Sequence, residues 1–271
     1  MILRFLLGAV VIFLILVVLV VLGQRRLLYP LRYVNRFEPS DTATRKILFR
    51  ATEGLRIEAW LLLPEKMSLR GLIVHAHGNG EILDQIETGF LHYGAEHGYA
   101  VLMPEYRGYS RSQGSPSKEL ILEDFEYFIG EVLRIYPELR GKMVFHGRSL
   151  GGGVVSELAK RVPPQGLILE STFTSVADVA SERFFIPKAW IWDNYSPSIL
   201  LREFKQPVLV IHGRQDDVIA FSHAERNFRT AKDAELLAFD GKHSDTISLN
   251  LSESRSGISR FLKKVESKSD R

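Results

Sequence analysis

A serine between two glycines is the clearest candidate for chemistry in this sequence. Residues 147–151 read G-R-S-L-G, which has the form G-x-S-x-G. The apolar run at 143–146 predicts a buried strand before it, and the apolar spacing over 150–161 predicts a helix after it. At the sharp turn between them, Ser149 would present its hydroxyl above the sheet, and the helix N-terminus below would favour developing negative charge. Because the same pattern also occurs by chance in glycine-rich loops, the flanking strand and helix carry the interpretation of Ser149 as a nucleophile.

A nucleophilic serine needs a general base, and histidine suits this role because its pKa lies near neutrality. His75 and His146 lie in apolar strand patterns and are expected in the core, and His212 ends a predicted strand where it can be structural. His243 follows the last predicted strand in a polar loop, from which its side chain could reach over the edge of the sheet, so it is the best candidate for the base. Three other histidines fall on predicted helix surfaces: His92, His97 and His223.

Two adjacent carboxylates, Asp216 and Asp217, follow the penultimate predicted strand. In an α/β sheet with a nucleophilic serine of this kind, the acid falls between the serine and the histidine along the chain. Neighbouring loop side chains point in different directions, so only one of the two is expected to orient the imidazole. The other would be solvated or would cap the next helix.

The composition and motifs favour other kinds of chemistry less. The chain has no cysteine, which excludes disulfides, thiol catalysis and zinc–thiolate sites. Its net charge is +3 and its basic residues are scattered, so nothing supports nucleic-acid binding. His75, His77 and Glu81 resemble a set of metal ligands, but alternate strand residues beside the turn at 78–80 explain the histidines better. We therefore expect neither a metal nor a cofactor.

Alternating strand and helix patterns predict one mostly parallel, doubly wound α/β sheet. Two β-rich runs, 45–51 and 56–63, are separated by Glu53-Gly54 and predict a hairpin at the edge of this sheet. Further strands are expected at 72–77, 99–103, 143–146, 167–170, 207–212 and 236–239. Helices are expected at 82–97, 117–136, 150–161, 223–231 and 247–265.

Residues 171–206 interrupt this alternation and are rich in aromatic side chains. As a short lid above the serine, this insert could form an apolar pocket for an acyl group. The alternative is ordinary packing of a helical excursion onto the sheet. The candidate pocket residues are Phe173, Phe184, Phe185, Trp190 and Trp192.

The chain begins with an unbroken apolar run from Phe5 to Leu22. As a helix this run would be about 27 Å long, close to the thickness of a bilayer's hydrocarbon core. A cleaved signal peptide would have a shorter apolar region followed by small residues, and 21–24 is a poor cleavage site. We therefore expect an uncleaved single-pass anchor at 1–26 and a single α/β domain at 27–271. Arginines after the run outnumber the one before it, which favours a cytoplasmic domain.

Together these features resemble the α/β-hydrolases, in particular small lysophospholipase-like or serine-aminopeptidase-like proteins with an N-terminal membrane anchor. The resemblance covers roughly residues 27–265. His77-Gly78-Asn79 is similar to the H-G-N loop of that family, and residues 106–110 are similar to its D-Y-R-G-Y-G loop, with Glu105 in place of the common aspartate. His212-Gly213-x-x-Asp216 resembles its acid loop and selects Asp216 over Asp217.

The resemblance implies a Ser149–Asp216–His243 triad, with the backbone N–H groups of Asn79 and Leu150 forming the oxyanion hole. It implies hydrolysis of a carboxylic ester, thioester or amide through an acyl-enzyme, without a cofactor. A membrane address makes lipid or lysolipid esters plausible substrates, but it does not define one. Two arginines, Arg148 and Arg107, are candidates for contact with an anionic head group or for packing within the loops.

Two other functions are compatible with the same residues. An acyltransferase would use the same triad with an alcohol or amine in place of water. A membrane-tethered domain without catalysis would serve only in binding, but the intact triad argues against it. The expected partners are a small-molecule or lipid acyl substrate and the membrane, with no nucleic acid; the sequence predicts no oligomeric state.

Overall fold

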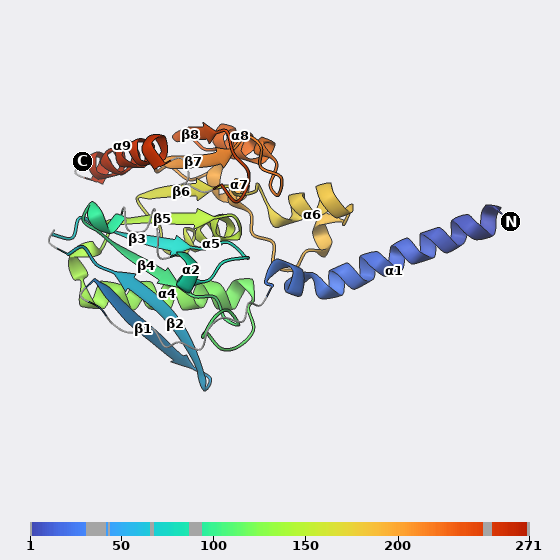
Figure 1. Ribbon diagram of the computed structural model, residues 1–271, viewed down its shortest axis with the longest axis horizontal. Coiled ribbons are helices and arrows are strands. Elements are labelled where there is room, and N and C mark those ends of the chain that lie inside the picture. Colours follow the sequence, from blue (N-terminus) through green and yellow to red (C-terminus); the bar gives the residue numbers. More distant parts are fainter. Residues whose placement is uncertain are drawn as a thin grey trace.

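A sheet of eight strands, in the order β1-β2-β4-β3-β5-β6-β7-β8, forms the centre of the computed structural model. The structure describes residues 2–30, 42, 44–65, 68–86, 94–245 and 251–269. Strand β1 pairs antiparallel with β2, and β2 pairs antiparallel with β4, whereas all later neighbours are parallel. Helices cover both faces of the sheet (Figure 1). The predicted mostly parallel α/β fold is therefore confirmed.

The strands match the predicted runs to within two residues at each end. They are β1 (Arg45–Thr52), β2 (Leu55–Leu62), β3 (Gly71–Ala76), β4 (Tyr99–Pro104), β5 (Met143–Arg148), β6 (Gly166–Glu170), β7 (Val208–Gly213) and β8 (Ala234–Phe239). The predicted edge hairpin is β1–β2, and its turn places Glu53 and Gly54 at positive φ.

Helices lie at the predicted positions 117–136, 150–161 and 223–231, and the helix predicted at 150–161 ends three residues early. The helices are α1 (Ile2–Leu28), α2 (Leu83–Ile86), α4 (Lys118–Ile135), α5 (Leu150–Leu158), α6 (Val176–Phe184), α7 (Pro197–Leu201), α8 (Phe221–Thr230) and α9 (Leu251–Ser269), with short 3-10 turns η1 (Pro137–Leu139) and η2 (Lys188–Trp190). Ser117 caps α4 by accepting a hydrogen bond from Leu120 N. His92, much of the helix predicted at 82–97 and the start of the one predicted at 247–265 lie outside the described residues.

Both faces of the sheet are buried. Because successive strand residues point to opposite sides, each central strand contributes to a core cluster on each face. In β3, Leu72 and Val74 belong to the core cluster that contains Phe125 of α4. Ile73, between them, belongs to the second cluster, which contains Phe261 of α9. Continuous apolar strands of this kind are typical of a parallel sheet covered on both faces, and they fix the sheet as a rigid support for the loops at its edge.

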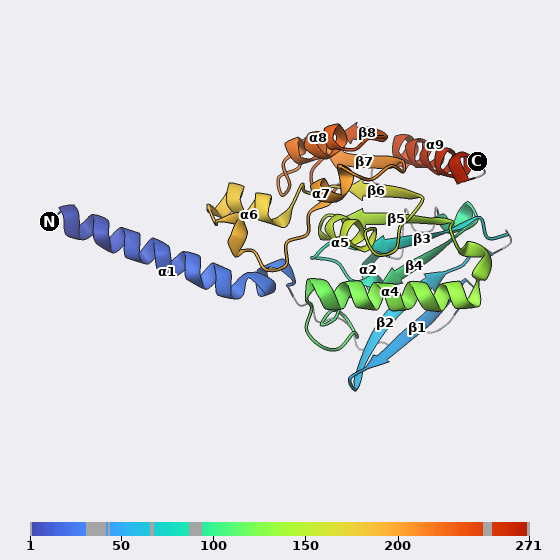
Figure 2. The same cartoon turned by 180° about the vertical axis from the view of Figure 1, so that it is seen from behind.

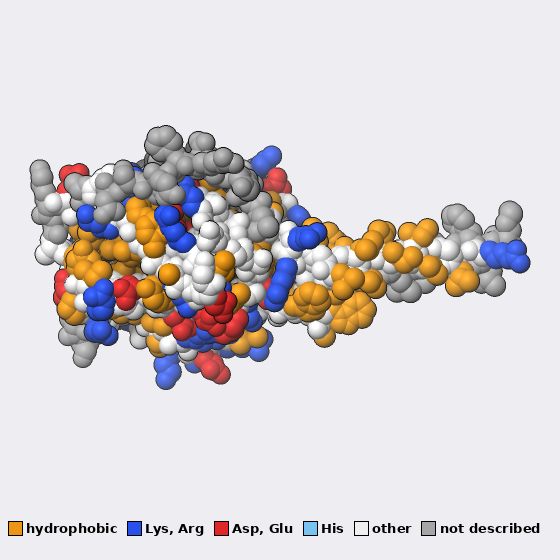
Figure 3. Space-filling view, turned by 90° about the horizontal axis from the view of Figure 1, so that it is seen from below, with side chains coloured by type: hydrophobic (Ala, Val, Ile, Leu, Met, Phe, Trp, Pro, Cys, Tyr) orange, Lys and Arg blue, Asp and Glu red, His pale blue; other side chains and the backbone are white. Residues whose placement is uncertain are grey.

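Helix α1 extends away from the body, and the insert at 171–206 lies where α1 meets it (Figures 1 and 2). The insert folds as α6, η2 and α7. Hydrophobic side chains cover α1 up to its junction with the body (Figure 3). Over Val11–Leu28 the mean hydropathy is 2.4 and only 6% of the residues are buried, so among the described residues α1 is the one helix long and apolar enough to cross a membrane.

Candidate active site

The turn between β5 and α5 holds Ser149 in a conformation that few residues adopt. Its backbone has φ 51° and ψ −116°, in the left-handed half of the map. Its N–H donates to the carbonyl of Glu170 at 2.8 Å, and Thr172 Oγ1 donates to the carbonyl of Ser149 at 2.7 Å. This strained strand-to-helix turn is the geometry that lifts a serine hydroxyl above a sheet.

The glycines around Ser149 are required by close backbone contacts. A Cβ atom at Gly147 would overlap the carbonyl of Gly151, and a Cβ at Gly151 would overlap the carbonyl of Ala76 in β3. Because the opposing atoms belong to backbone, a side-chain rotation cannot relieve either overlap.

We expect Gly151→Ala to lower the free energy of unfolding by about 3 kcal/mol, since the added methyl must displace the end of β3. The matched control is Gly130→Ala within α4, where a Cβ would meet nothing within 4 Å. That control is expected to gain about 1 kcal/mol from helix propensity. Urea unfolding of the full chain in detergent measures both values, and a neutral Gly151→Ala would contradict the tight turn.

Three loops at the carboxyl edge of the sheet bring Ser149, His243 and Asp216 together. His243 Nε2 lies 3.1 Å from Ser149 Oγ, and His243 Nδ1 lies 2.8 Å from Asp216 Oδ2. The loops follow β5, β8 and β7, whose parallel register puts their ends at one edge. Ser149 lies 94 residues before His243 in the sequence, and Asp216 lies 27 residues before it. The three side chains nevertheless form one hydrogen-bonded chain.

Asp216 is held as a buried carboxylate. Its side chain is fully buried, and Oδ1 accepts the backbone N–H groups of Val218 and Ile219 at 2.9 and 2.7 Å. Burial alone would raise the pKa of Asp216, but hydrogen bonds from His212, His243 and the Ile219 N–H together hold this pKa well below its ordinary value. A carboxylate here favours the tautomer of His243 that carries its proton on Nδ1, in which Nε2 can accept a hydrogen bond from Ser149.

His212 is a second brace for Asp216 that the sequence analysis did not assign. Its Nε2 lies 2.9 Å from the carbonyl of Ile219 and 3.1 Å from Asp216 Oδ2. The signal was present in the spacing, because a histidine at the end of β7 and an aspartate four residues later share one tight loop. Asp217 is exposed, and the carboxylate that contacts the imidazole of His243 is that of Asp216.

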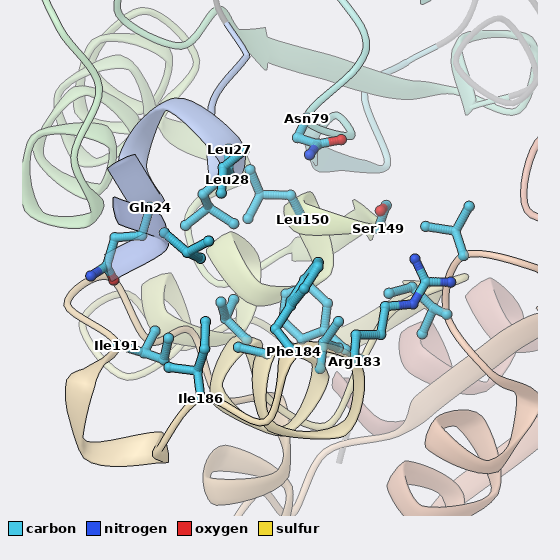
Figure 4. Close-up of a pocket in the computed structure, with 17 residues that line it drawn as sticks. Gln24, Leu27, Leu28, Asn79, Ser149, Leu150, Arg183, Phe184, Ile186 and Ile191 are labelled. Carbon is cyan, nitrogen blue, oxygen red and sulfur yellow. The ribbon is translucent and has the colours of Figure 1, made fainter. Parts of the chain in front are cut away.

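The loop after β3 carries Asn79 to the wall of the same cavity as Ser149 and Leu150 (Figure 4). Leu150 is the first residue of α5, so its N–H has no acceptor within the helix. Tyr109 Oη donates to the carbonyl of Asn79 at 3.0 Å and fixes that side of the loop. The two residues whose N–H groups are predicted to bind an oxyanion therefore line the cavity that also contains Ser149.

Glu105, which replaces the common aspartate of the related motif, holds the loop that carries Asn79 by contacts on either side of it. It lies 2.8 Å from His77 Nε2 through Oε1, and its Oε2 accepts the N–H of Leu83 at 3.0 Å. Tyr106 Oη donates to the carbonyl of His77 at 2.7 Å. Glu105, Tyr106 and Tyr109 thus support the loop that carries Asn79.

An apolar cavity of about 360 Å³ opens beside Ser149 (Figure 4). Of the predicted pocket residues, Phe173 and Phe184 line it, whereas Phe185, Trp190 and Trp192 do not. The last three point outward: Phe185 ends α6 in a left-handed conformation, and the two tryptophans flank Ile191, which takes the inward position. The assignment of these three residues to the pocket was therefore wrong.

Helix α1 forms part of the cavity wall, which the sequence did not indicate. Val20, Gln24, Leu27 and Leu28 all line it. The boundary expected between residues 26 and 27 falls inside α1, and residues on both sides of it face the same space. Figure 4 shows Gln24, Leu27 and Leu28 on the far side of the cavity from Arg183 of α6.

The two arginines considered for an anionic head group are neutralised by internal ion pairs. Arg107 is buried and makes a bidentate contact with Asp124, at 2.7 and 3.0 Å. Arg148 pairs with Glu81 and donates to the carbonyl of His243 at 2.9 Å. Both therefore act in packing, and Arg148 also positions the loop that carries the base.

His223 was expected on a helix surface, but the structure shows that this expectation was wrong. It is buried, with Nδ1 3.0 Å from Thr174 Oγ1 and Nε2 3.1 Å from Glu182. The helix α8 is amphipathic, and position 223 lies on the face that meets the insert. His223 thereby fastens the start of the insert to the body.

Comparison with known families identifies relatives of this chain. Residues 67–203, just over half of the chain, match the family described as serine aminopeptidase, S33. The chain belongs to this family of hydrolases. The matched segment of this S33 hydrolase contains the Asn79 loop and Ser149 but ends before Asp216 and His243, so for these two residues the three-dimensional contacts are the evidence.

Relatives of the S33 hydrolase come from several kingdoms. YfhR of Escherichia coli is 28% identical over 226 residues, which cover 78% of each chain. The α/β hydrolase domain-containing protein WAV2 of Arabidopsis thaliana is 28% identical and covers 79% of this chain and 78% of its own. The membrane protein YNL320W of Saccharomyces cerevisiae is 26% identical and covers 83% and 84%.

The fold is similar to those of solved esterases. The Pyrococcus furiosus esterase Pf2001 superposes with a TM-score of 0.68 at 20% identity, covering 86% of this chain and 95% of its own. Est1E from Butyrivibrio proteoclasticus, solved with ferulic acid, superposes with a TM-score of 0.61 at 16% identity, covering 80% and 99%. At these identities the likeness shows the α/β-hydrolase fold.

Behind the site of the S33 hydrolase lies a buried histidine pair. His75 Nδ1 is 2.9 Å from His146 Nδ1, and His146 Nε2 is 3.0 Å from Glu170. Burial, together with the nearby His146, His77 and Arg148, lowers the pKa of His75 well below its ordinary value. His75 is therefore neutral in the folded protein and protonated in the unfolded chain at mildly acidic pH.

This difference predicts a loss of stability in acid. The contribution of His75 is fully present above its unfolded pKa of about 6.5 and is lost as the pH falls from there through the folded-state pKa. Between about pH 7.5 and about pH 5.5 the full chain is expected to lose about 1.4 kcal/mol more than the non-titrating variant His75→Gln. Urea unfolding at the two pH values measures this, and parallel losses would contradict it.

Proposed function

We propose that this protein is a membrane-anchored serine hydrolase that cleaves a carboxylic ester through an acyl-enzyme intermediate. The hydrogen-bonded chain from Ser149 Oγ through His243 to Asp216, at 3.1 and 2.8 Å, is the observation that supports this most. Thioesters and amides would react by the same steps.

In the first half of the reaction, Ser149 Oγ attacks the carbonyl carbon while His243 Nε2 accepts the hydroxyl proton. The N–H groups of Asn79 and Leu150 bind the oxyanion, and each donor of this kind typically contributes about 3–4 kcal/mol. As the intermediate collapses, His243 returns its proton to the departing alcohol and the acyl group stays on Ser149. Asp216 stabilises the His243 imidazolium that forms in this half of the reaction and again in the second half.

Water completes the cycle. It takes the place of the alcohol, loses a proton to His243 and attacks the acyl-enzyme; the second intermediate then releases the acid and returns the proton to Ser149 Oγ. The apolar cavity beside Ser149 would hold the acyl part of the substrate through both halves.

Helix α1 is proposed as the anchor. Its length of 27 residues and its apolar composition suit a bilayer, and the yeast relative YNL320W is called a membrane protein. Arg25 and Arg26 in its last turn favour a cytoplasmic position for the domain that follows.

Labelling by a fluorophosphonate tests the proposed nucleophile. The full-length wild type is expected to take up one probe per chain, because the phosphonate reacts with a serine that an adjacent base activates. Ser149→Ala is expected to take up none, and Ser222→Ala, which changes an exposed serine on α8, is expected to react like the wild type. A folded wild type that remains unlabelled would refute the proposal.

A further inference from the structure

The last turns of α1 are fastened to the insert by polar contacts. Gln24 donates from Nε2 to the carbonyl of Trp190 at 3.1 Å and accepts the N–H of Trp192 on Oε1 at 2.8 Å. Arg25 pairs with the buried carboxylate of Asp193 at 3.0 Å. One turn later, the hydroxyls of two buried tyrosines, Tyr29 and Tyr195, lie 3.0 Å apart. The segment 190–195 and the end of α1 therefore form one unit.

These contacts fix the level of the insert relative to a membrane crossed by α1. No charged residue lies between Arg4 and Arg25, and as a helix that uncharged stretch is about 30 Å long, the thickness of the hydrocarbon core. Arg4 and Arg25 are thus expected near opposite head-group layers. Because residues 190–193 bond to Gln24 and Arg25, they must lie at the same head-group level as Arg25.

The insert exposes four large aromatic side chains, two of them in the segment bonded to Gln24, and we call the four the aromatic face. Their exposed fractions are 53% for Phe184, 79% for Phe185, 47% for Trp190 and 52% for Trp192. Hydrophobic side chains gather at the junction of α1 with the body (Figure 3). Such a group is unfavourable in water, whereas tryptophan in particular is favoured at the interface of a bilayer.

The cavity connects the same level to the serine. Its wall contains Val20, which lies about 8 Å deeper along α1 than Arg25, and Ile191 between the two exposed tryptophans. Its other end holds Ser149 and Leu150. An apolar space that begins beside a membrane helix and ends at a nucleophile suits an acyl chain that stays partly in the bilayer.

We propose that the aromatic face docks on the lipid surface around α1, and that the cavity receives an acyl chain of an ester lipid from that same membrane, with its carbonyl at Ser149. This rests on the proposed function for the chemistry and on α1 for the anchor. It adds the substrate class, a membrane-resident ester lipid, and the direction from which the substrate arrives.

Tryptophan fluorescence tests the docking without any reaction. The chain has three tryptophans; Trp60 is buried in β2, and the other two belong to the aromatic face. The full-length protein is placed in phosphatidylcholine vesicles with plain or brominated acyl chains, since bromine quenches only indoles that lie among the lipids. Emission is expected to fall by about half in brominated vesicles and to be equal in both for Trp190→Gln/Trp192→Gln. Equal wild-type emission in the two vesicles would overturn the proposal.

Hydrolysis of two substrates tests the route of entry. The variant Phe185→Asn/Trp192→Gln changes two side chains that do not line the cavity, and asparagine tolerates the positive φ at 185. It is expected to hydrolyse a water-soluble short-chain ester like the wild type, but a long-chain ester lipid in phosphatidylcholine vesicles about tenfold more slowly. The matched control is Phe49→Asn, an exposed aromatic on β1.

The outcomes distinguish a failure of the proposed entry from the membrane from a failure of the proposed hydrolase function. Equal rates of the double variant and the wild type on vesicle lipid, or an equal loss on both substrates, would overturn entry from the membrane. A wild type inactive on every ester would refute the proposed function, while the fluorescence result would still decide whether the face docks.

Discussion

Replacing Ser149 with alanine is expected to lower kcat for an ester by about 10⁶-fold. The substitution removes the hydroxyl oxygen that lies 3.1 Å from His243 Nε2 at the wall of the cavity. Without it no acyl-enzyme forms, and only the binding and oxyanion-hole contributions over the reaction in water remain. Single-turnover and steady-state hydrolysis by the full chain in detergent would measure the loss.

The control for this loss must separate chemistry from folding. Alanine at 149 has to adopt the same positive φ, so unfolding of Ser149→Ala is measured alongside. Ser222→Ala is expected to keep full activity. If Ser149→Ala retained more than about one hundredth of the wild-type rate, another nucleophile would have to exist and the proposed mechanism would be wrong.

Asp216→Asn is expected to lower kcat by about 10⁴-fold with little change in fold. The remaining amide oxygen can still accept the N–H groups of Val218 and Ile219 that now bond to Oδ1. The new NH₂ group would face His243 Nδ1, which must then become an acceptor. The imidazole proton moves to Nε2, and the base can no longer accept the proton of Ser149.

Asp217→Asn is the matched control for this change. It removes the same charge one residue away, from an exposed carboxylate, and is expected to leave kcat within about twofold of the wild type. A large loss for Asp217→Asn together with a small one for Asp216→Asn would show that the acid has been assigned to the wrong residue. The pH–rate profiles of both variants would identify which carboxylate orients the base.

The parts of the fold that follow local patterns could be predicted from the sequence. Each central strand is an apolar run buried on both faces, so its limits are visible in composition alone. The elbow at 147–151 was predictable because overlaps with backbone allow only glycine on both sides of Ser149. The choice of Asp216 over Asp217 needed the resemblance to a family, because adjacency in a loop does not say which side chain turns inward.

Features that depend on distant contacts could not be predicted. Aromatic residues in the insert are apolar whichever way they point, and only the packing of α6 and η2 shows Phe184 turned to the cavity and Phe185 turned away. His223 was expected at a surface because its hydrogen-bond partners, the buried Thr174 and the exposed Glu182, lie 49 and 41 residues earlier. The same holds for Gln24, whose partners lie 166 and 168 residues later.

With α1 as the proposed anchor, the position of Val20, Gln24, Leu27 and Leu28 in the cavity wall would make the membrane anchor part of the substrate site. Proteolytic shedding ahead of the domain would strip one side from the acyl site and leave the Ser149–His243–Asp216 constellation intact. The released fragment would still react with small esters but would bind esters with long acyl chains more weakly. Under this proposal, a graft of the domain onto a foreign membrane segment would have to reproduce those four side chains to keep its selectivity for long acyl chains.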